Sequence, residues 1–401
     1  MPVFLKQLRL GNFLSFGPDS PLMEFGALNL VIGPNGSGKS NLGTAIEFLR
    51  RIPLGFVNTF QRMGDPADLL WKGKRDGGAG ILAMFVNEHG RNVLYHVTFD
   101  LQNGGLQLTG ENVELRLTGE KVERLAVTYF SEPANDPDRL AYVNDGKAAK
   151  LRAPKSALQR ELAGKITTGD TVLVQIKAPG AFPEIGFLQD NIPLIRLFRR
   201  WTLGPTSPLH DLARADDRGD FLSEDLDNLP NVLSWLARNV PLKRQILKYL
   251  GDVGQGLEDY AISALGGRVG LYVQEGDWTV SATRMSDGTL KFLALVAILL
   301  HPTPPPLLFL EEPELGLHPD MIPTLAELLR DAAGRTQLIV TTHSRDLIDC
   351  FTDTPEVVLV CEKQDGQTHI GPAHAPGMDA ILQQTTLGTM WAEGHIGGNR
   401  W

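Results

Sequence analysis

Short apolar runs separated by turns fill the first third of the chain. Residues 3–10 and 28–32 are predicted strands, and the second one leads directly into a glycine-rich loop. Apolar positions at helical spacing predict a helix at about 41–51. Gly, Asn and Asp turns then separate three more predicted strands, at 81–86, 93–99 and 125–130.

The pattern changes between about residues 131 and 260, where Pro, Asp and Arg accumulate. Apolar residues recur there at spacings of three and four over 229–250, which predicts helix. Pro241 lies inside this stretch and should divide it into two helices, because a proline interrupts helical hydrogen bonding. We therefore expect a mainly helical segment in the middle of the chain.

Strand and helix patterns alternate again after about residue 265. This alternation predicts an α/β fold in which one domain is built from both ends of the chain. The simplest organisation has an N-terminal lobe at 1–130, an inserted helical subdomain at 131–262 and a C-terminal lobe at 263–401. The elements predicted in the last part are strands at 269–273, 307–310, 337–341 and 356–360 and helices at 288–300 and 321–333.

Composition narrows the class of protein. The 401 residues are 42% hydrophobic and 21% charged, a profile typical of a folded globular protein and not of a disordered or collagen-like chain. The 38 basic and 47 acidic residues give a net charge of −9. This balance excludes a general nucleic-acid coat, so contact with DNA would need a local patch or a partner.

Two further features bear on location. Cys350 and Cys361 form no CxxC or Cys/His cluster, which argues against zinc or a disulfide framework and predicts a reducing, cytoplasmic setting. The uncharged stretch 292–310 contains four prolines. We therefore expect a buried helix, a loop and a buried strand there, and no membrane span.

A phosphate-binding loop is the strongest chemical signal. It is a complete G-x4-G-K-S motif, with a predicted strand before it and a predicted helix after it. Its backbone N–H groups would face phosphate oxygens, Lys39 would reach the β- and γ-phosphates, and the Ser40 hydroxyl would bind Mg²⁺. We expect nucleotide contacts from Gly33, Pro34, Asn35, Gly36, Ser37, Gly38, Lys39, Ser40 and Asn41.

Two later strands end in residues suited to the same site. The strand at 307–310 is followed by Glu311, which would support the metal, and Glu312, which would orient or deprotonate a water molecule. The strand at 337–341 leads to His343, which could contact the γ-phosphate or hold that water. Ser286 caps the helix that follows it and leaves N–H groups for an anion.

The order of these motifs resembles the ABC-type ATPase heads of the SMC/RecF/OLD-like group, in particular its stand-alone predicted ATPases. The fold that this resemblance implies is an α/β ABC-type ATPase head, a P-loop NTPase with mixed sheets and an inserted helical subdomain. The matching pieces lie in both terminal thirds of the chain, at 8–16, 32–40, 285–300, 307–319 and 337–344.

The resemblance assigns roles within one subunit. Lys39 and Ser40 match the Walker A motif, and Glu311 and Glu312 match Walker B. His343 matches the switch histidine. Glu312, His343 and Lys39 would be catalytic, whereas Ser40 and Glu311 would hold the metal. The cofactors implied are ATP and Mg²⁺.

Other matches imply an assembly. Ser286 and Gly288 match the signature motif, which in this class completes the ATP site of the other subunit, and residues 314–318 match the D-loop, which crosses between subunits. Two ATP molecules would then lie between two heads arranged head to tail, and an ATP-dependent homodimer is expected.

Some positions depart from the common pattern of the group. The first Walker B acid is Glu311 where many relatives have Asp, and the signature reads Ser-Asp-Gly-Thr at 286–289 in place of Ser-Gly-Gly. Leu14 stands where a basic residue is common, which leaves the adenine contacts unassigned. Gln61 is the nearest candidate for the glutamine loop, although an ordinary loop residue is the simpler interpretation.

Several biological roles are compatible with such an ATPase. The segment after His343 is too short for the nuclease domain of OLD-like proteins, so the leading hypothesis is a regulatory switch in DNA repair or anti-phage defence with a separate effector, for example a nuclease. The signature disfavours a transporter ATPase, and a nucleotide-binding scaffold with little turnover stays open. A direct DNA binder like RecF would use the basic–aromatic cluster Arg196, Arg199, Arg200 and Trp201, for which a solvated face is the simpler interpretation.

Overall fold

A computed structural model gives the fold of the chain. The described residues are 3–56, 59, 63–73, 78–102, 105–116, 125–130, 142–144, 149–151, 170–177, 182–253, 257–373 and 378–397. The glutamine-loop candidate Gln61 lies outside them.

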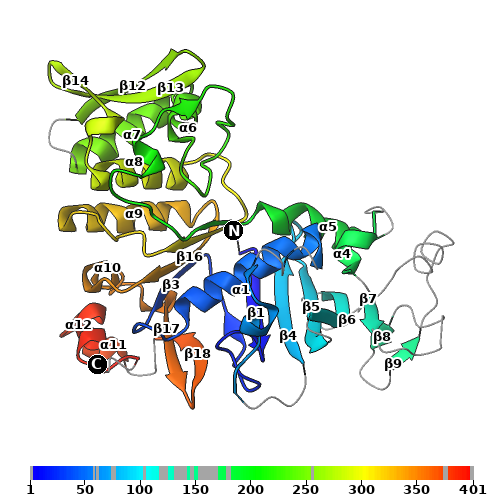
Figure 1. Cartoon of the computed structure of the whole chain (residues 1–401). Coiled ribbons are helices and arrows are strands. Elements are labelled where there is room, and N and C mark those ends of the chain that lie inside the picture. Colours follow the sequence, from blue (N-terminus) through cyan, green and yellow to red (C-terminus); the bar gives the residue numbers. More distant parts are fainter. Residues whose placement is uncertain are drawn as a thin grey trace.

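A six-stranded sheet carries the predicted phosphate loop (Figure 1). Its strands lie in the order β10-β15-β16-β3-β17-β18, and all neighbours are parallel except the last pair. Every residue of β3 is buried, as expected for a strand covered on both faces. The bounds are β10 (Arg196–Phe198), β15 (Leu307–Glu311), β16 (Gln337–Thr342), β3 (Leu28–Ile32), β17 (Val358–Gln364) and β18 (Gln367–Pro372).

Two antiparallel sheets complete the strand framework. The larger one has eight strands in the order β2-β1-β4-β5-β6-β7-β8-β9. In the smaller one β13 pairs with β11, β12 and β14. The bounds are β1 (Leu5–Gly11), β2 (Met23–Glu24), β4 (Ala79–Val86), β5 (Asn92–Gln102), β6 (Gly105–Arg116), β7 (Leu125–Phe130), β8 (Tyr142–Asn144), β9 (Ala149–Leu151), β11 (Ala213–Arg214), β12 (Leu257–Leu265), β13 (Arg268–Glu275) and β14 (Trp278–Ser281).

Helices cover both faces of the parallel sheet. Figure 1 shows α8 and α9 on one side of it and α1 on the other. The helix α8 is buried from Leu290 to Leu299, which explains its nearly unbroken apolar sequence. The bounds are α1 (Lys39–Arg51), α4 (Val172–Gln175), α5 (Pro183–Asn191), α6 (Leu229–Leu236), α7 (Val240–Val253), α8 (Asp287–Leu299), α9 (Ile322–Ala332), α10 (Arg345–Asp349), α11 (Met378–Leu382) and α12 (Leu387–Ala392).

The parallel sheet separates two hydrophobic cores. On β15, Leu308 and Leu310 belong to the core with α6 to α9, whereas Leu307 and Phe309 belong to the core with α1 and the large antiparallel sheet. Alternate residues of a strand point to opposite faces, so each apolar run stabilises both cores. These runs hold the carboxyl ends of β3, β15 and β16 in one row.

One buried amide joins the two largest sheets. The Oε1 of Gln337, at the start of β16, accepts the backbone N–H groups of Phe4 (3.1 Å) and Leu5 (2.7 Å). Its Nε2 donates to the carbonyl oxygens of Leu5 and Gly26, each at 2.8 Å. A polar side chain in this position is stable only because all its hydrogen-bonding groups have partners. The N-terminal strand is thereby fixed to the C-terminal part of the sheet.

Most predicted elements are present with small shifts at their ends. The stretch 229–250 forms two helices, and Pro241 is the second residue of α7, where its missing N–H costs little. The strand predicted at 356–360 begins at Val358 because the 3-10 turn Pro355–Val357 precedes it. The stretch 292–310 is the expected helix, loop and strand, and no described helix is long and apolar enough to span a membrane.

The middle segment contributes to the core as well as carrying helices. Its strand β10 pairs with β15 and forms one edge of the parallel sheet. The boundaries 1–130, 131–262 and 263–401 stay a prediction.

Candidate nucleotide site

The loop between β3 and α1 has a backbone that requires glycine. Gly36 and Gly38 have φ angles of 73° and 118°. A Cβ atom on Gly33 would lie 2.1 Å from the carbonyl oxygen of Cys361. No side chain caps the helix that begins at Lys39, and its first turn contains no acid. The N–H groups of that turn are therefore suited to an anion.

Lys39 is buried inside the curve of the loop. Its Nζ donates to the carbonyl oxygens of Gly33 (2.7 Å) and Pro34 (3.0 Å). Burial lowers the pKa of this amine, and the nearby Glu312 and Glu311 oppose that shift. The cation thus lies beside the N–H groups of the loop, where phosphate oxygens would compensate its charge.

Ser40 and Glu311 meet although they are far apart in the sequence. The Ser40 Oγ donates to Glu311 Oε1. Hydroxyl and carboxylate oxygens are ligands that Mg²⁺ prefers, so this pair fits the metal. The described residues contain no group of three His, Cys, Asp or Glu side chains that could hold an ion alone. A metal held by this pair would take its other ligands from nucleotide phosphates and water, as Mg²⁺ commonly does.

Glu312 and His343 form the second contact between predicted site residues. The His343 Nε2 lies 2.9 Å from Glu312 Oε1. Glu312 has a φ of 48°, rare for a residue with a side chain, and its N–H donates to the carbonyl oxygen of Thr341 (2.9 Å). Burial and the charge of Lys39 lower the pKa of the imidazole, and Glu312 opposes the shift. The arrangement suits a carboxylate that accepts a proton and a histidine that orients it.

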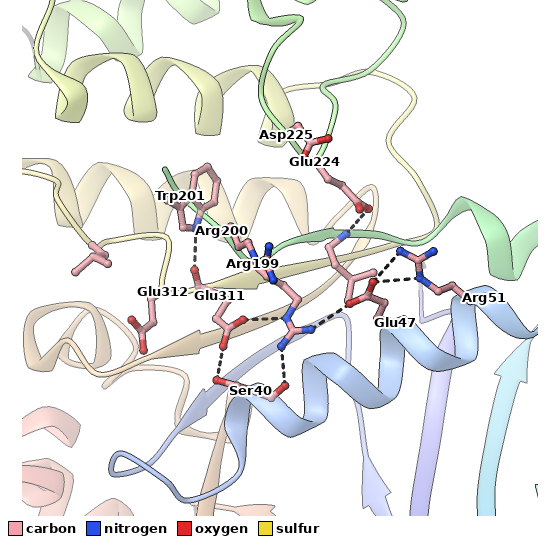
Figure 2. A pocket seen from close by; sticks show the side chains of 12 residues that line it. Ser40, Glu47, Arg51, Arg199, Arg200, Trp201, Glu224, Asp225, Glu311 and Glu312 are labelled. Atoms are coloured by element: carbon pink, nitrogen blue, oxygen red, sulfur yellow. Dashed lines mark hydrogen bonds and ion pairs between the residues drawn. The ribbon is translucent and has the colours of Figure 1, made fainter. Parts of the chain in front are cut away.

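Arg199 enters the site from the end of β10 (Figure 2). Its Nε donates to Glu311 Oε2 (3.0 Å) and its Nη2 to the carbonyl oxygen of Ser40 (3.0 Å) and the Thr44 hydroxyl (3.1 Å). Its Nη1 lies 3.2 Å from Glu47 Oε2. Arg199 therefore contacts both metal-ligand candidates and helix α1.

Trp201 and Lys291 hold the chain around the two acids. The Trp201 Nε1 donates to the backbone oxygen of Glu311 (2.8 Å). Lys291 lies on α8 and is fully buried, and its Nζ donates to the carbonyl oxygens of Glu312 (3.3 Å) and Leu315 (2.6 Å). The same Nζ lies 4.5 Å from the centroid of the Trp201 ring. Two side chains from different elements thus fix the backbone that carries Glu311 and Glu312.

The terminal regions support the loop from outside. The Thr368 hydroxyl donates to the carbonyl oxygen of Ser37 (2.7 Å), and its Oγ1 also lies 2.7 Å from Ser15 Oγ. The Asn41 amide donates to Ser15 Oγ (2.7 Å), so this predicted nucleotide contact is bound to a neighbouring segment. Asn35 and Gly36 are exposed at the tip of the loop.

The signature residues lie apart from the loop of their own chain. Ser286 is exposed and caps α8, with its Oγ accepting the Thr289 N–H (3.1 Å). Among the described residues, no hydrogen bond joins Ser286 or Gly288 to residues 33–41. A Cβ on Gly288 would lie 2.8 Å from the Gly316 carbonyl oxygen, so α8 packs against the loop that follows β15.

Asp287 binds within its own chain. Its Oδ2 accepts the Gly204 N–H (2.9 Å), and its Oδ1 lies 2.8 Å from His210 Nε2. The segment that brings Arg199 and Trp201 to the metal-ligand candidates is thus also attached to the start of α8.

Comparison with known proteins agrees with this geometry. A family model described as "AAA domain, putative AbiEii toxin, Type IV TA system" matches residues 28–124 and 207–349, more than half of the chain. The chain belongs to this family. The match includes the phosphate loop, the start of α8, the two acids after β15 and His343, and it excludes Arg199 and Trp201. Membership and fold together identify a P-loop ATPase family.

Curated relatives share a short segment with this AAA-domain protein. The chromosome partition protein Smc of Desulfitobacterium hafniense (strain Y51) is 48% identical over 50 residues, which are 12% of this chain and 4% of that protein. Smc of Clostridium kluyveri (strain NBRC 12016) is 39% identical over 49 residues, again 12% of this chain and 4% of the relative. The chain therefore corresponds to a small part of these proteins.

Solved structures establish the fold of this family member. An Smc head bound to the C-terminal winged-helix domain of ScpA gives a TM-score of 0.51 at 15% identity, covering 94% of this chain and 99% of that one. An Smc head with an extended coiled coil from Pyrococcus furiosus, bound to the C-terminal domain of ScpA, gives 0.50 at 15% identity, covering 95% and 99%. The predicted ABC-type head fold is confirmed.

Sequence reasoning missed Arg199, Trp201 and Lys291 as members of the site. We expected Arg199 and Trp201 in a surface cluster, but the structure places both against Glu311. One signal was available: Arg199 directly follows the short strand β10, and Glu311 likewise stands at the end of its strand β15. Lys291 interrupts an otherwise apolar helix, which is the mark of a buried cation with a specific task.

Proposed function

We propose that the protein binds ATP with Mg²⁺ and hydrolyses it at this site. The observation that carries the proposal is the joint placement of Lys39, the Ser40–Glu311 pair and the Glu312–His343 pair at the carboxyl ends of three neighbouring strands. In parallel sheets, this edge is where ligands bind.

The chemistry follows from the position of each side chain. Backbone N–H groups of the loop and Lys39 would hold the β- and γ-phosphates. Bound Mg²⁺ would neutralise charge on the phosphates, with Ser40 and Glu311 as its protein ligands. Glu312 would accept a proton from the attacking water, and His343 would keep the carboxylate oriented.

We further propose that two copies close head to tail around two nucleotides. In support, Ser286 is exposed at the N-terminus of α8 and has no hydrogen bond to the loop of its own chain among the described residues. A helix N-terminus attracts anions, so the phosphates of a second subunit are a suitable ligand. ATP binding would then stabilise the closed pair and hydrolysis would release it.

The cellular task we infer is regulatory. The family description names a toxin of a Type IV TA system, that is, one component of a two-component system. This supports a switch in anti-phage defence or DNA repair that acts on a separate effector, for example a nuclease.

Glu312→Gln tests the proposed function directly. Without the proton acceptor, phosphate release should fall at least about 100-fold, and bound ATP should persist. The molar mass of Glu312→Gln in solution should be that of a dimer with ATP and Mg²⁺ and that of a monomer without them. Glu327→Gln, on the exposed side of α9, is the control and should match wild type in both measurements. If the molar mass of Glu312→Gln is the same with and without ATP, the head-to-tail pair is refuted. If its phosphate release equals that of wild type, the role of Glu312 is refuted.

A further inference from the structure

We propose that Arg199 is a positioning residue for the metal: its guanidinium holds both protein ligands, Ser40 and Glu311, in the arrangement that binds the ion. This inference rests on the proposed function, because it concerns the same nucleotide site. If Arg199 has this role, the middle segment at 131–262 contributes directly to the nucleotide site.

The strand register brings Arg199 to the metal-ligand candidates. β10 pairs in parallel with β15, with Phe198 opposite Leu310. The next residues along the chain are Arg199, just after β10, and Glu311, the last residue of β15, so both lie at the carboxyl edge of the sheet. The side chain of Arg199 is 23% exposed, and Figure 2 shows it lying between β15 and helix α1.

The contacts of the guanidinium leave the two ligand oxygens for the ion. Arg199 binds Oε2 of Glu311, while Oε1 of the same carboxylate faces the Ser40 hydroxyl. On Ser40 it binds the backbone carbonyl and not Oγ. The arginine therefore holds each ligand from behind and orients Oε1 and Oγ toward each other. This is the outer-shell arrangement that fixes metal ligands in many proteins.

A second possibility is that Arg199 is only a counter-ion that the metal must displace. Two observations argue against it. Glu47 binds the remaining nitrogen Nη1 at 3.2 Å, so the charge of the arginine is compensated from α1. The Trp201 Nε1 binds the Glu311 backbone, and its ring stacks on Phe198 at 6.0 Å, so the segment is anchored independently of the guanidinium.

The neighbouring Arg200 provides a matched control. Arg199, Ser40 and Glu311 line a cavity of about 700 Å³, shown in Figure 2, and Arg200 lines it as well. The side chain of Arg200 is exposed, and no hydrogen bond or ion pair of it is found among the described residues. Substituting it changes the net charge near the site by the same amount as substituting Arg199. A difference between the two variants therefore reports geometry and not charge.

The test measures Mn²⁺ binding, by electron paramagnetic resonance, to the protein with a non-hydrolysable ATP analogue. Arg199→Lys and Arg199→Gln should both weaken Mn²⁺ binding by about 10- to 100-fold, and Arg200→Gln should stay within about twofold. Lysine keeps the charge but lacks the planar fork, so its failure to substitute identifies geometry as the cause. If Arg199→Gln binds Mn²⁺ as tightly as wild type or more tightly, the proposal is overturned.

Two further measurements separate the possible failures. Binding of a fluorescent ATP analogue in EDTA reports the phosphate loop alone and should be the same in all variants. A wild-type protein that binds no nucleotide would refute the proposed function, whereas equal Mn²⁺ affinities with normal nucleotide binding would refute only the role of Arg199. Should Arg199→Gln fail to fold, Arg199→Lys decides the question: wild-type affinity for Mn²⁺ in that variant refutes the role.

Discussion

At the scale of single residues, Lys291 shows how a buried cation can organise a turn. Burial lowers the pKa of its amine to about 7, and the nearby Glu314 and Glu312 oppose the shift. The amine nevertheless keeps two carbonyl partners, Glu312 and Leu315, that no other side chain reaches in the described contacts. The turn that carries the proposed catalytic acid therefore depends on one side chain from α8.

Lys291→Met should change how stability depends on pH. The folded pKa of about 7 lies below the unfolded value of 10.5, so between these pH values the unfolded chain binds more protons. The free energy of unfolding of wild type should therefore rise from pH 7 to 9.5 relative to the variant, by up to about 1.4 kcal/mol per pH unit. Urea unfolding at pH 7, 8 and 9 measures this.

The control for Lys291 is Lys248→Met, because Lys248 is exposed on α7. The free energy of unfolding of Lys248→Met should change with pH by the same amount as that of wild type over this range. A Lys291→Met curve that is also parallel to wild type would show that the buried amine does not titrate in this window.

Individual residues were predictable where the signal is local. The phosphate loop is continuous in sequence, so its glycines, Lys39 and Ser40 could be found directly. Arg199 and Glu311 are 112 residues apart, and only the pairing of β10 with β15 brings them together. The position of Arg199 after a short apolar run is only a weak signal, because the exposed Arg200 follows the same run.

At the scale of elements, a buried carboxyl joins strand β6 to helix α4. The Glu111 Oε1 accepts the Tyr95 hydroxyl (2.9 Å), and its Oε2 accepts the Val172 N–H (2.6 Å). Burial raises the pKa of this carboxyl to about 8, and the charge of Asp170 acts in the same direction. The neutral form is thus favoured in the folded protein.

Glu111→Gln should flatten the pH dependence of stability in mildly acid solution. Because the folded pKa exceeds the ordinary value of 4.5 for a glutamate, the stabilisation is complete below pH 4.5 and is lost as the pH rises toward 8. Wild type should therefore lose stability relative to the variant between pH 5 and 7. Denaturant unfolding at pH 5, 6 and 7 measures the difference.

Glu258→Gln, exposed on β12, is the matched control and should leave the pH profile unchanged. If wild type and Glu111→Gln gave the same slope, the raised pKa of Glu111 would be disproved.

The elements that carry the site motifs were predictable, but their neighbours in the sheet were not. Apolar runs such as 28–32 and 125–130 coincide with β3 and β7, because their periodicity and flanking turns are local properties. The sheet order β10-β15-β16-β3-β17-β18 depends on packing between segments from the whole chain. The short strand β10 was missed, since three residues give too little periodicity, and the longer strands β6 and β12 were not predicted either.

At the scale of the whole molecule, the surface around the site contains an exposed apolar side chain. Leu315 follows the proposed catalytic acid by three residues, is 56% exposed and lines the cavity of Figure 2. It lies within residues 314–318, the segment that we expect to meet the second copy in the proposed head-to-tail pair. An apolar residue there suits contact with a second copy.

Leu315→Glu should weaken the proposed pair at least about tenfold, because closing it would bury a carboxylate without a partner. Made in the Glu312→Gln background, it should prevent the ATP-dependent doubling of mass while ATP affinity stays within about twofold. Light scattering with and without ATP measures the first, and fluorescent-nucleotide titration the second.

Leu54→Glu is the control, since Leu54 is 63% exposed just beyond the end of α1. In the Glu312→Gln background, Leu54→Glu should show the same ATP-dependent doubling of mass as Glu312→Gln alone. Normal dimerisation of Leu315→Glu would show that this surface does not meet a partner.

The position of β3 in the sheet also determines when the site can first exist during synthesis. Both neighbours of β3, the strands β16 and β17, are made about 300 residues after it. At ribosomal rates of 5–20 residues per second, its buried apolar residues wait on the order of tens of seconds for a partner. A nascent chain therefore carries the complete phosphate-loop sequence long before it can hold a nucleotide, and ribosome-bound chaperones have that interval in which to protect it.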